Sequence, residues 1–319
     1  MARKDVNIVS SLVGKGLERE ALLLRDFLIA HDIYTVFIHY TDYSRATLAR
    51  ADVTMFLEVV MPNALHLAKE NWLLPNSEWW GGVNDRFVPM FTKVLGKTED
   101  CVDIWKKKLA GDRPERVSFL GFESRDLYDE KVDRSDKFLH VAGESEFKNT
   151  EAVLAAWNKP SWPIKPVPLT VVCRQKKFSD ILKNSEFVTC LDKVSDAELK
   201  QLMNSHRYHV MPSSYEGFGH SLHESISCGA LVVTTDARPM KDFLGVQVDC
   251  LVPVSSTSMR SLATMNTVSP DGVIATCAKL LSIVSRQGEA ERRSAVARSA
   301  FLSDRDSFRS KLLSLLEVE

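Results

Sequence analysis

Short, mostly apolar blocks alternate along the chain with longer stretches in which apolar residues recur every three or four positions. Mostly apolar blocks, such as 6–9 and 34–39, are typical of buried strands. Between them lie stretches with apolar residues three or four apart, such as 17–30, which are typical of amphipathic helices. Strands that alternate with helices predict an α/β protein with parallel sheets.

The alternation of predicted strands and helices occurs in two separate halves of the chain. A mostly polar or charged stretch, 123–137, separates the two halves and is the best linker candidate. We therefore predict domains over 1–125 and 126–300, with 301–319 as a terminal helix. The predicted strands are 6–9, 34–39, 53–60, 72–75, 93–96, 116–122, 138–142, 169–173, 187–190, 208–211, 231–233 and 251–254. The predicted helices are 17–30, 62–69, 100–109, 151–157, 178–183, 272–284, 290–300 and 306–316, with others starting after Ser195 and ending at Gly229.

Composition and charge narrow the class of protein. With 319 residues, 45% of them hydrophobic and 26% charged, the chain suits two ordinary globular domains. A formal charge of −1 gives no general attraction to nucleic acid or an anionic membrane. The sequence has no apolar run long enough to span a bilayer and no signal peptide pattern, so we expect a cytoplasmic protein.

Metal and disulfide chemistry is not indicated. The six cysteines are scattered without a C-x-x-C pair, and the eight histidines form no convincing ligand set. The single Asp-x-Asp, at 304–306, precedes a predicted helix, where acidic residues serve as caps. We therefore expect no metal and no cofactor.

The stretch 212–236 carries the strongest chemical signal. It predicts a strand, a turn with Gly217 and Gly219, a helix and a second strand. The N–H groups at the start of such a helix suit a phosphate, and such turns lie where open α/β sheets bind ligands. Glu216 lies in the turn and Glu224 on the helix, where it shares a face with His220. Because carboxylates repel phosphate, we interpret both as acceptors for sugar hydroxyls.

This stretch resembles a known signature. Pro-Ser-x-x-Glu-Gly-Phe-Gly-His, with seven residues between Glu216 and Glu224, is similar to the E-x7-E motif of retaining group 1 (family 4-like) glycosyltransferases of the GT-B fold. The resemblance is strong over 138–245 and loose before that. It implies that the Gly217-Phe218-Gly219 backbone receives the distal phosphate and sugar of the donor, with His220 in contact. It also implies that Glu216 binds the transferred sugar and Glu224 the ribose diol.

A second turn, after the strand 138–142, extends the predicted donor site. Family members place an arginine and a lysine there against the diphosphate, and Lys148 matches the lysine. The arginine has no counterpart, because Glu144 and Ser145 occupy that part of the loop, so Arg174 after the next strand is the candidate replacement. Lys148 and Ser145 would neutralise the leaving diphosphate, which makes Lys148 and Glu216 the catalytic candidates. Near the nucleotide base, the resemblance points to Leu191 and Val194.

The first domain gives weaker signals. Gly14 and Gly16 lie where the family has a glycine loop facing the cleft, and an ordinary helix-entry turn explains them equally well. Glu58 interrupts an apolar strand, so it either reaches the cleft or is paired. Glu78 and Trp79, in Glu-Trp-Trp-Gly-Gly, suggest an acceptor-side wall, and the alternative is tryptophans packed on a neighbouring helix.

The resemblance implies two Rossmann-like domains facing each other across a cleft, with the C-terminal helix crossing back to the first. The expected activity is retaining, metal-independent transfer of a sugar from a nucleotide-diphosphate sugar, UDP- or GDP-linked, to a glycan, lipid-linked sugar, protein or other hydroxyl acceptor. Three alternatives stay open: transfer to modified bases in DNA, epimerisation of nucleotide sugars, and binding of sugar nucleotides without catalysis. The oligomeric state is not indicated.

Overall fold

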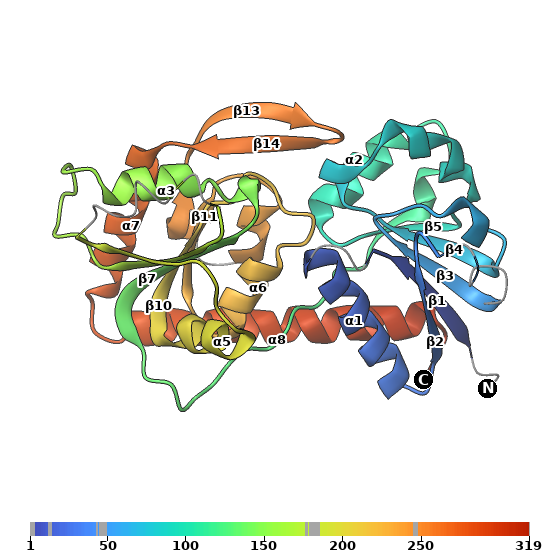
Figure 1. Cartoon of the computed structure of the whole chain (residues 1–319), viewed down its shortest axis with the longest axis horizontal. Coiled ribbons are helices and arrows are strands. Elements are labelled where there is room, and N and C mark those ends of the chain that lie inside the picture. Colours follow the sequence, from blue (N-terminus) through green and yellow to red (C-terminus); the bar gives the residue numbers. More distant parts are fainter. Residues whose placement is uncertain are drawn as a thin grey trace. The chain divides into compact units, whose positions relative to one another are not determined.

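The computed structural model describes residues 4–11, 15–42, 44, 50–175, 178, 186–244 and 248–318. The chain divides into two compact units (Figure 1). The first, which we call unit 1, comprises residues 1–124, 259–263 and 304–319. The second, unit 2, comprises residues 125–258 and 264–303.

Unit 1 is built on a six-stranded sheet in which every neighbouring pair of strands is parallel. The strand order is β2-β1-β3-β4-β5-β6, so the chain reverses its direction of growth after β2. Alternating strands and helices produce this arrangement, because parallel neighbours need crossover connections. The strands are β1 (Asp5–Ser10), β2 (Tyr34–His39), β3 (Ala51–Leu57), β4 (Ala68–Leu74), β5 (Lys93–Gly96) and β6 (Val117–Phe119). The helices that connect them include α1 (Lys15–Ala30) and α2 (Glu99–Lys108).

Unit 2 repeats the plan with the strand order β12-β11-β10-β7-β8-β9, again with parallel pairs. Its helices α3 and α7 lie on one face of the sheet, and α5 and the start of α8 lie on the other (Figure 1). The strands are β7 (Ser135–Gly143), β8 (Leu169–Cys173), β9 (Val188–Leu191), β10 (His206–Met211), β11 (Leu231–Thr235) and β12 (Leu251–Val252). The helices are α3 (Thr150–Trp157), α5 (Asp196–Ser205), α6 (His220–Ser227) and α7 (Pro270–Val284).

Each sheet is buried on both faces, which explains why its strands read as continuous apolar blocks. In unit 2 the central residues Leu139, Val210 and Val232 have no exposed surface. In unit 1 the same holds for Ile8 and Phe56. The α/β class with two Rossmann-like sheets is therefore confirmed. Open sheets of this kind generally bind ligands at the carboxyl ends of their strands.

The C-terminal helix differs from the prediction. The sequence suggested a break at 303–305, but α8 is one helix of 27 residues, Glu289–Leu315. Ser303, Asp304 and Arg305 contain neither glycine nor proline, so they did not stop the helix. Its last part packs in unit 1, where the Phe308 ring centroid lies 5.0 Å from that of Phe122. The return of the terminal helix to the first unit is thus confirmed.

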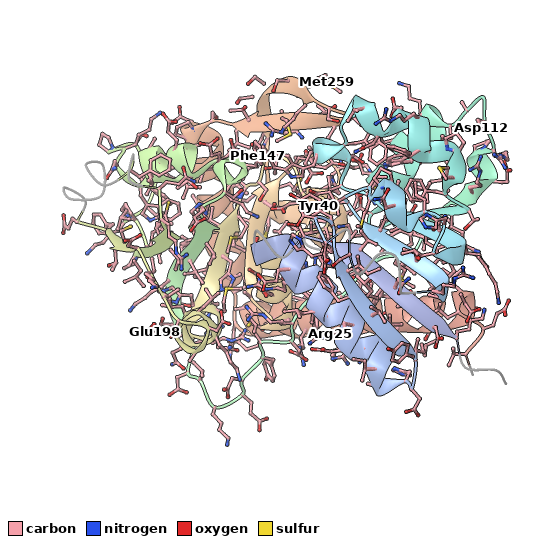
Figure 2. All side chains as sticks on the ribbon, turned by 45° about the vertical axis from the view of Figure 1, so that its right-hand side comes forward. Arg25, Tyr40, Asp112, Phe147, Glu198 and Met259 are labelled. Atoms are coloured by element: carbon pink, nitrogen blue, oxygen red, sulfur yellow. The ribbon has the colours of Figure 1, made fainter. Side chains whose placement is uncertain are left out.

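Two other elements were predicted wrongly. The segment 62–69 is not a helix: a 3-10 turn covers Pro62–Ala64, and β4 begins at Ala68. A hairpin of β13 (Val254–Arg260) and β14 (Ala263–Val268) was not predicted at all. Figure 2 labels Met259 near its tip. The predicted helix 178–183 and Gly14 lie outside the described residues, apart from Phe178. Among the helices that the structure describes, none has the length and apolar character to cross a membrane.

Candidate functional site

The turn between β10 and α6 has the geometry of an anion site. Gly219 is the N-cap of α6, has φ +87°, and provides no capping side chain. The N–H groups of Leu222 and His223 both bond to its carbonyl at 3.0 Å. A Cβ on Gly219 would lie 3.0 Å from Cε2 of Phe243, so glycine fits this position for both backbone and steric reasons. The start of α6 therefore offers its N–H groups and positive dipole end to a ligand.

Lys148 lies beside this helix start. Its Nζ donates to the Glu216 carboxylate and, at 2.9 Å, to Oγ of Ser221 in the first turn of α6. Ser213 Oγ donates to the same carboxylate. The side chains of Lys148 and Glu216 are each only 12% exposed. The two catalytic candidates are thus brought into contact, with a cation at the start of α6 and an acid beside it.

The turns after β7 and β10 are bonded to one another. Ser145 caps the 3-10 turn that follows β7, its Oγ accepting from Phe147 N–H at 3.2 Å. Phe147, labelled in Figure 2, accepts a bond from Ser214 N–H at 2.8 Å. Asn149, with φ +46°, donates from its side chain to the Pro212 carbonyl at 2.8 Å. These bonds fix the position of Lys148 relative to α6.

His140, which the sequence did not single out, lies beneath the turns that follow β7 and β10 and contacts both neighbouring elements. His140 on β7 is fully buried, with Nδ1 2.6 Å from the Val210 carbonyl and Nε2 2.9 Å from Oγ of Thr150. Burial lowers the pKa of His140 to about 4, so the ring is neutral at ordinary pH. A neutral ring can donate from Nδ1 to the carbonyl and accept at Nε2 from the Thr150 hydroxyl. His140 thereby connects β7, β10 and the start of α3.

Glu224 is nearly inaccessible, with 3% of the residue exposed. Arg125 donates from Nε to its Oε1 at 3.0 Å, and the Arg125 guanidinium also lies 3.4 Å from Asp196. No local sequence pattern links Arg125 to Glu224, because 99 positions separate them. Arg125 therefore could not be recognised from the sequence.

Phe218 and the two histidines of α6 take different positions. Phe218 is buried and stacks on the His223 ring, with centroids 4.1 Å apart. His223 Nδ1 lies 3.1 Å from the Gly219 carbonyl, and burial lowers the pKa of His223 to about 4. His220 and Gly217 are partly exposed. His223 therefore supports the turn, and the partly exposed residues of the turn include Glu216, Gly217 and His220.

The remaining donor-side candidates lie around the turn after β7 and at the end of β9. The backbone N–H of Arg174 donates to the Gly143 carbonyl at 2.8 Å, and the Arg174 guanidinium pairs with the Glu144 carboxylate at 3.1 Å. Arg174 thus reaches the predicted turn. Leu191 and Val194 are half-buried and pack against the hydrophobic cluster that contains Met203.

In unit 1, Glu58 follows β3 with φ +63°, a conformation that costs energy for a side chain other than glycine. Asn76, after β4, donates to the Glu58 carboxylate. Glu58 is thus paired with a polar side chain, which is one of the two alternatives stated for it. Burial raises the pKa of Glu58, and the nearby Lys97 ammonium opposes that shift. Lys97 is itself buried and bonds to both carboxylate oxygens of Glu20, at 2.7 and 2.8 Å. The carboxyl ends of β3 and β5 thus carry a buried polar cluster.

The two adjacent tryptophans differ. Trp80 is buried against Trp105 of α2, with centroids 4.7 Å apart, as the packing alternative stated. Trp79 is 48% exposed, and the guanidinium of Arg260 lies 4.3 Å from its ring. Glu78, between Ser77 and Trp79 in a 3-10 turn, is buried. Gly16 is exposed in the first turn of α1, which begins at Lys15 rather than after the predicted loop.

Within the described part of the chain, no three His, Cys, Asp or Glu side chains come together in a way that could hold a metal ion. At the α6 turn lie a lysine ammonium, a helix start and two carboxylates with fixed partners.

Part of the chain is similar to one known protein family. Residues 135–264 match the sequence model of the family described as "Glycosyl transferases group 1". This range includes Lys148, Glu216, Gly219 and Glu224. A search of curated proteins found no match.

Solved structures resemble the whole chain. A glycosyltransferase from Rickettsia africae has a TM-score of 0.69 at 12% identity, covering 99% of this chain and 98% of that one. An α,α-trehalose-phosphate synthase (UDP-forming) from Burkholderia vietnamiensis has a TM-score of 0.66 at 10% identity, covering 99% and 100%. The pneumococcal O-GlcNAc transferase GtfA in complex with UDP and GlcNAc has a TM-score of 0.65 at 11% identity, covering 87% and 59%, so this chain spans about three fifths of GtfA.

Proposed function

We propose that the chain is a glycosyltransferase of the GT-B fold, because residues 135–264 match the group 1 glycosyl transferase model and solved glycosyltransferases share its fold. It transfers a sugar from a nucleotide-diphosphate sugar to a hydroxyl of an acceptor, with retention of the anomeric configuration and without a metal ion. Unit 2 holds the donor, and unit 1 contributes the acceptor side.

One observation carries this proposal: Lys148 Nζ bonds both the Glu216 carboxylate and Ser221 Oγ at the start of α6. An ammonium beside a helix start is a place where a diphosphate gains charge-assisted hydrogen bonds without any ion. Because the Lys148 side chain is mostly buried, these contacts act in a medium where charges interact more strongly than in water.

The same charges favour the reaction step. As the bond between the sugar and the diphosphate breaks, negative charge grows on the departing phosphate oxygens. Lys148 and the N–H groups at the start of α6 are already in place to stabilise that charge, so the step needs no reorganisation. Glu216, held by Lys148 and Ser213, accepts hydroxyls of the transferred sugar. Glu224, held by Arg125, accepts the ribose hydroxyls of the nucleotide.

On the acceptor side, we assign the carboxyl edge of the unit 1 sheet. Glu58 lies at the end of β3 in a strained conformation, which is common at functional positions. Trp79 presents a half-exposed indole, a surface on which sugar rings pack well. These two residues would bind the acceptor.

Transfer and donor hydrolysis by the purified protein test the proposal. A panel of UDP- and GDP-linked sugars is incubated alone and with glycan, lipid-linked and protein acceptors, with and without EDTA. The proposal expects release of nucleoside diphosphate from one donor, a product of retained configuration by NMR, and equal rates with EDTA. Interconversion of the donor sugar without acceptor would instead indicate an epimerase. An inverted product, or activity lost with EDTA and restored by Mg²⁺ or Mn²⁺, would contradict those parts of the proposal.

A further inference from the structure

We propose that Arg125 is a positioning residue that orients Glu224 for the donor ribose. Through Glu224, Arg125 sets the preference of the site for a ribonucleotide over a deoxyribonucleotide. This inference rests on the proposed function, because it assigns a new residue to the same donor site.

The contact between the two side chains is direct and largely shielded from water. Arg125 Nε donates to Glu224 Oε1 at 3.0 Å, and the Glu224 side chain is 4% exposed. A carboxylate with so little access to water needs a charged or hydrogen-bonding partner, because burying it unpaired is costly. The second contact of Arg125, with Asp196 at 3.4 Å, is to a side chain that is 82% exposed, so it contributes little. The main function of the guanidinium is therefore at Glu224.

The backbone on which Arg125 is carried is itself fixed to α6 and its neighbours. Leu127 N–H donates to Ser227 Oγ at 3.1 Å, and Asn204 donates to the Leu127 carbonyl at 2.7 Å. Asp126 forms a two-pronged pair with Arg298 of α8, at 2.6 and 2.8 Å. Because Asp126 and Leu127, the two residues that follow it, are both held, Arg125 approaches Glu224 from one fixed direction. It can orient the carboxylate rather than merely neutralise it.

The orientation of the Glu224 carboxylate determines which hydroxyls it can bind. Two neighbouring hydroxyls of a ribose can both donate to one carboxylate only if its plane faces them. The bond from Arg125 fixes the rotation of the Glu224 carboxylate about its last single bond, because it holds one oxygen. Sites built to bond a hydroxyl discriminate strongly against the analogue that lacks it. Loss of one such bond to a charged group corresponds to roughly a tenfold to hundredfold loss of affinity.

The test uses the full-length protein and isothermal titration calorimetry. Dissociation constants are measured for UDP and GDP, and the tighter of the two is then compared with its 2′-deoxy and 3′-deoxy analogues. The variants are Arg125→Gln, Arg125→Lys and Glu224→Gln. Arg207→Gln is the matched control, because Arg207 also forms two ion pairs in unit 2, with Asp136 and Glu291. Urea denaturation of each variant separates effects on binding from effects on stability.

For the wild type and Arg207→Gln we expect a ribose preference of about tenfold or more. Arg125→Gln should reduce that preference to about threefold or less, as should Glu224→Gln, and combining the two changes should cause no further loss. Arg125→Lys keeps the charge without the fixed fork of donors, so its preference should lie between those of the wild type and Arg125→Gln. If Arg125→Gln does not fold, the ribose preference of Arg125→Lys tests the inference instead.

Three outcomes would overturn the inference. An unchanged ribose preference in the Arg125 variants shows that Glu224 needs no orientation. An equal loss of affinity for the ribonucleotide and both deoxy analogues shows that the guanidinium contacts the phosphates instead. A wild type that binds a nucleoside diphosphate without ribose preference refutes the roles of Glu224 and Arg125 while leaving the diphosphate site intact. Failure of the wild type to bind either nucleotide contradicts the proposed function itself.

Discussion

Replacing Lys148 with alanine is the most informative single change, because Lys148 connects the two features of the donor site. The substitution removes one ammonium that contacts both Glu216 and Ser221. It leaves the Glu216 carboxylate with its bond from Ser213. The start of α6 keeps its own N–H groups. The variant therefore tests the charge and leaves the backbone of the site in place.

The size of the effect follows from the position of the charge. Two opposite charges about 4 Å apart interact by roughly 4 kcal/mol at an effective dielectric constant of about 20. Removal of a single group that stabilises a developing oxyanion typically costs about 10²–10³ in kcat. We therefore expect kcat to fall about a hundredfold to a thousandfold, with a smaller loss of donor affinity. The Glu216 carboxylate, now less well paired, should lower the stability of unit 2 by about 1–3 kcal/mol.

The assay measures kcat and KM for transfer, together with urea denaturation. Lys159→Ala is the matched control, because Lys159 forms a single ion pair with Asp271 at the surface, at 2.7 Å. Such a pair is worth about 0.2–1 kcal/mol, so the control should keep its activity. Lys148→Arg should retain part of the rate, since it restores a cation. If Lys148→Ala keeps kcat within about threefold of the wild type, the assignment of the leaving-group charge to Lys148 is wrong.

Three further changes test the supporting structure. Gly219→Ala places a Cβ at φ +87° and 3.0 Å from Phe243, so it should destabilise the protein by about 1–2 kcal/mol and weaken nucleotide binding; a variant equal to the wild type in both would contradict this. Ser195→Ala removes half of a capping box at α5 and should cost about 1 kcal/mol in urea denaturation without changing kcat. His140 has its pKa lowered to about 4 by burial, against about 6.5 unfolded, so its stabilising effect is complete above pH 6.5 and is lost as the pH falls to 4. The wild type should thus lose up to about 3 kcal/mol over that range that His140→Gln does not, and parallel pH profiles would rule this out.

Much of the fold could be predicted because apolar periodicity and short signatures determine it locally. The strands 34–39, 93–96 and 169–173 have the predicted bounds, and the Ser195–Glu198 capping box forms as its spacing indicated. Such features need only neighbouring residues, so the sequence is enough to find them.

The missed elements lack such local signals. Residues 254–260 are mostly exposed, so the strand buries no face and shows no apolar alternation. The segment predicted as the helix 62–69 instead ends in β4, which begins at Ala68 and carries the buried Trp72, so tertiary packing overrides helix propensity there.

The site residues likewise divide into those with a local sequence signal and those without one. The pairing of Lys148 with Glu216 joins two turns that the sequence had separately marked, and they meet because β7 and β10 are parallel neighbours in the structure. Arg125 and His140 were not marked, because their roles depend on partners 99 and 70 positions away. Burial of a charge or a ring in the fold, rather than any motif, reveals them.

A crystal structure of the protein with a bound nucleoside diphosphate tests the central claim most directly. The account predicts that the distal phosphate lies within hydrogen-bond distance of Lys148 Nζ and of the backbone N–H groups at the start of α6, with the ribose hydroxyls on Glu224. A diphosphate bound elsewhere, with Lys148 still paired only to Glu216 and Ser221, would contradict it.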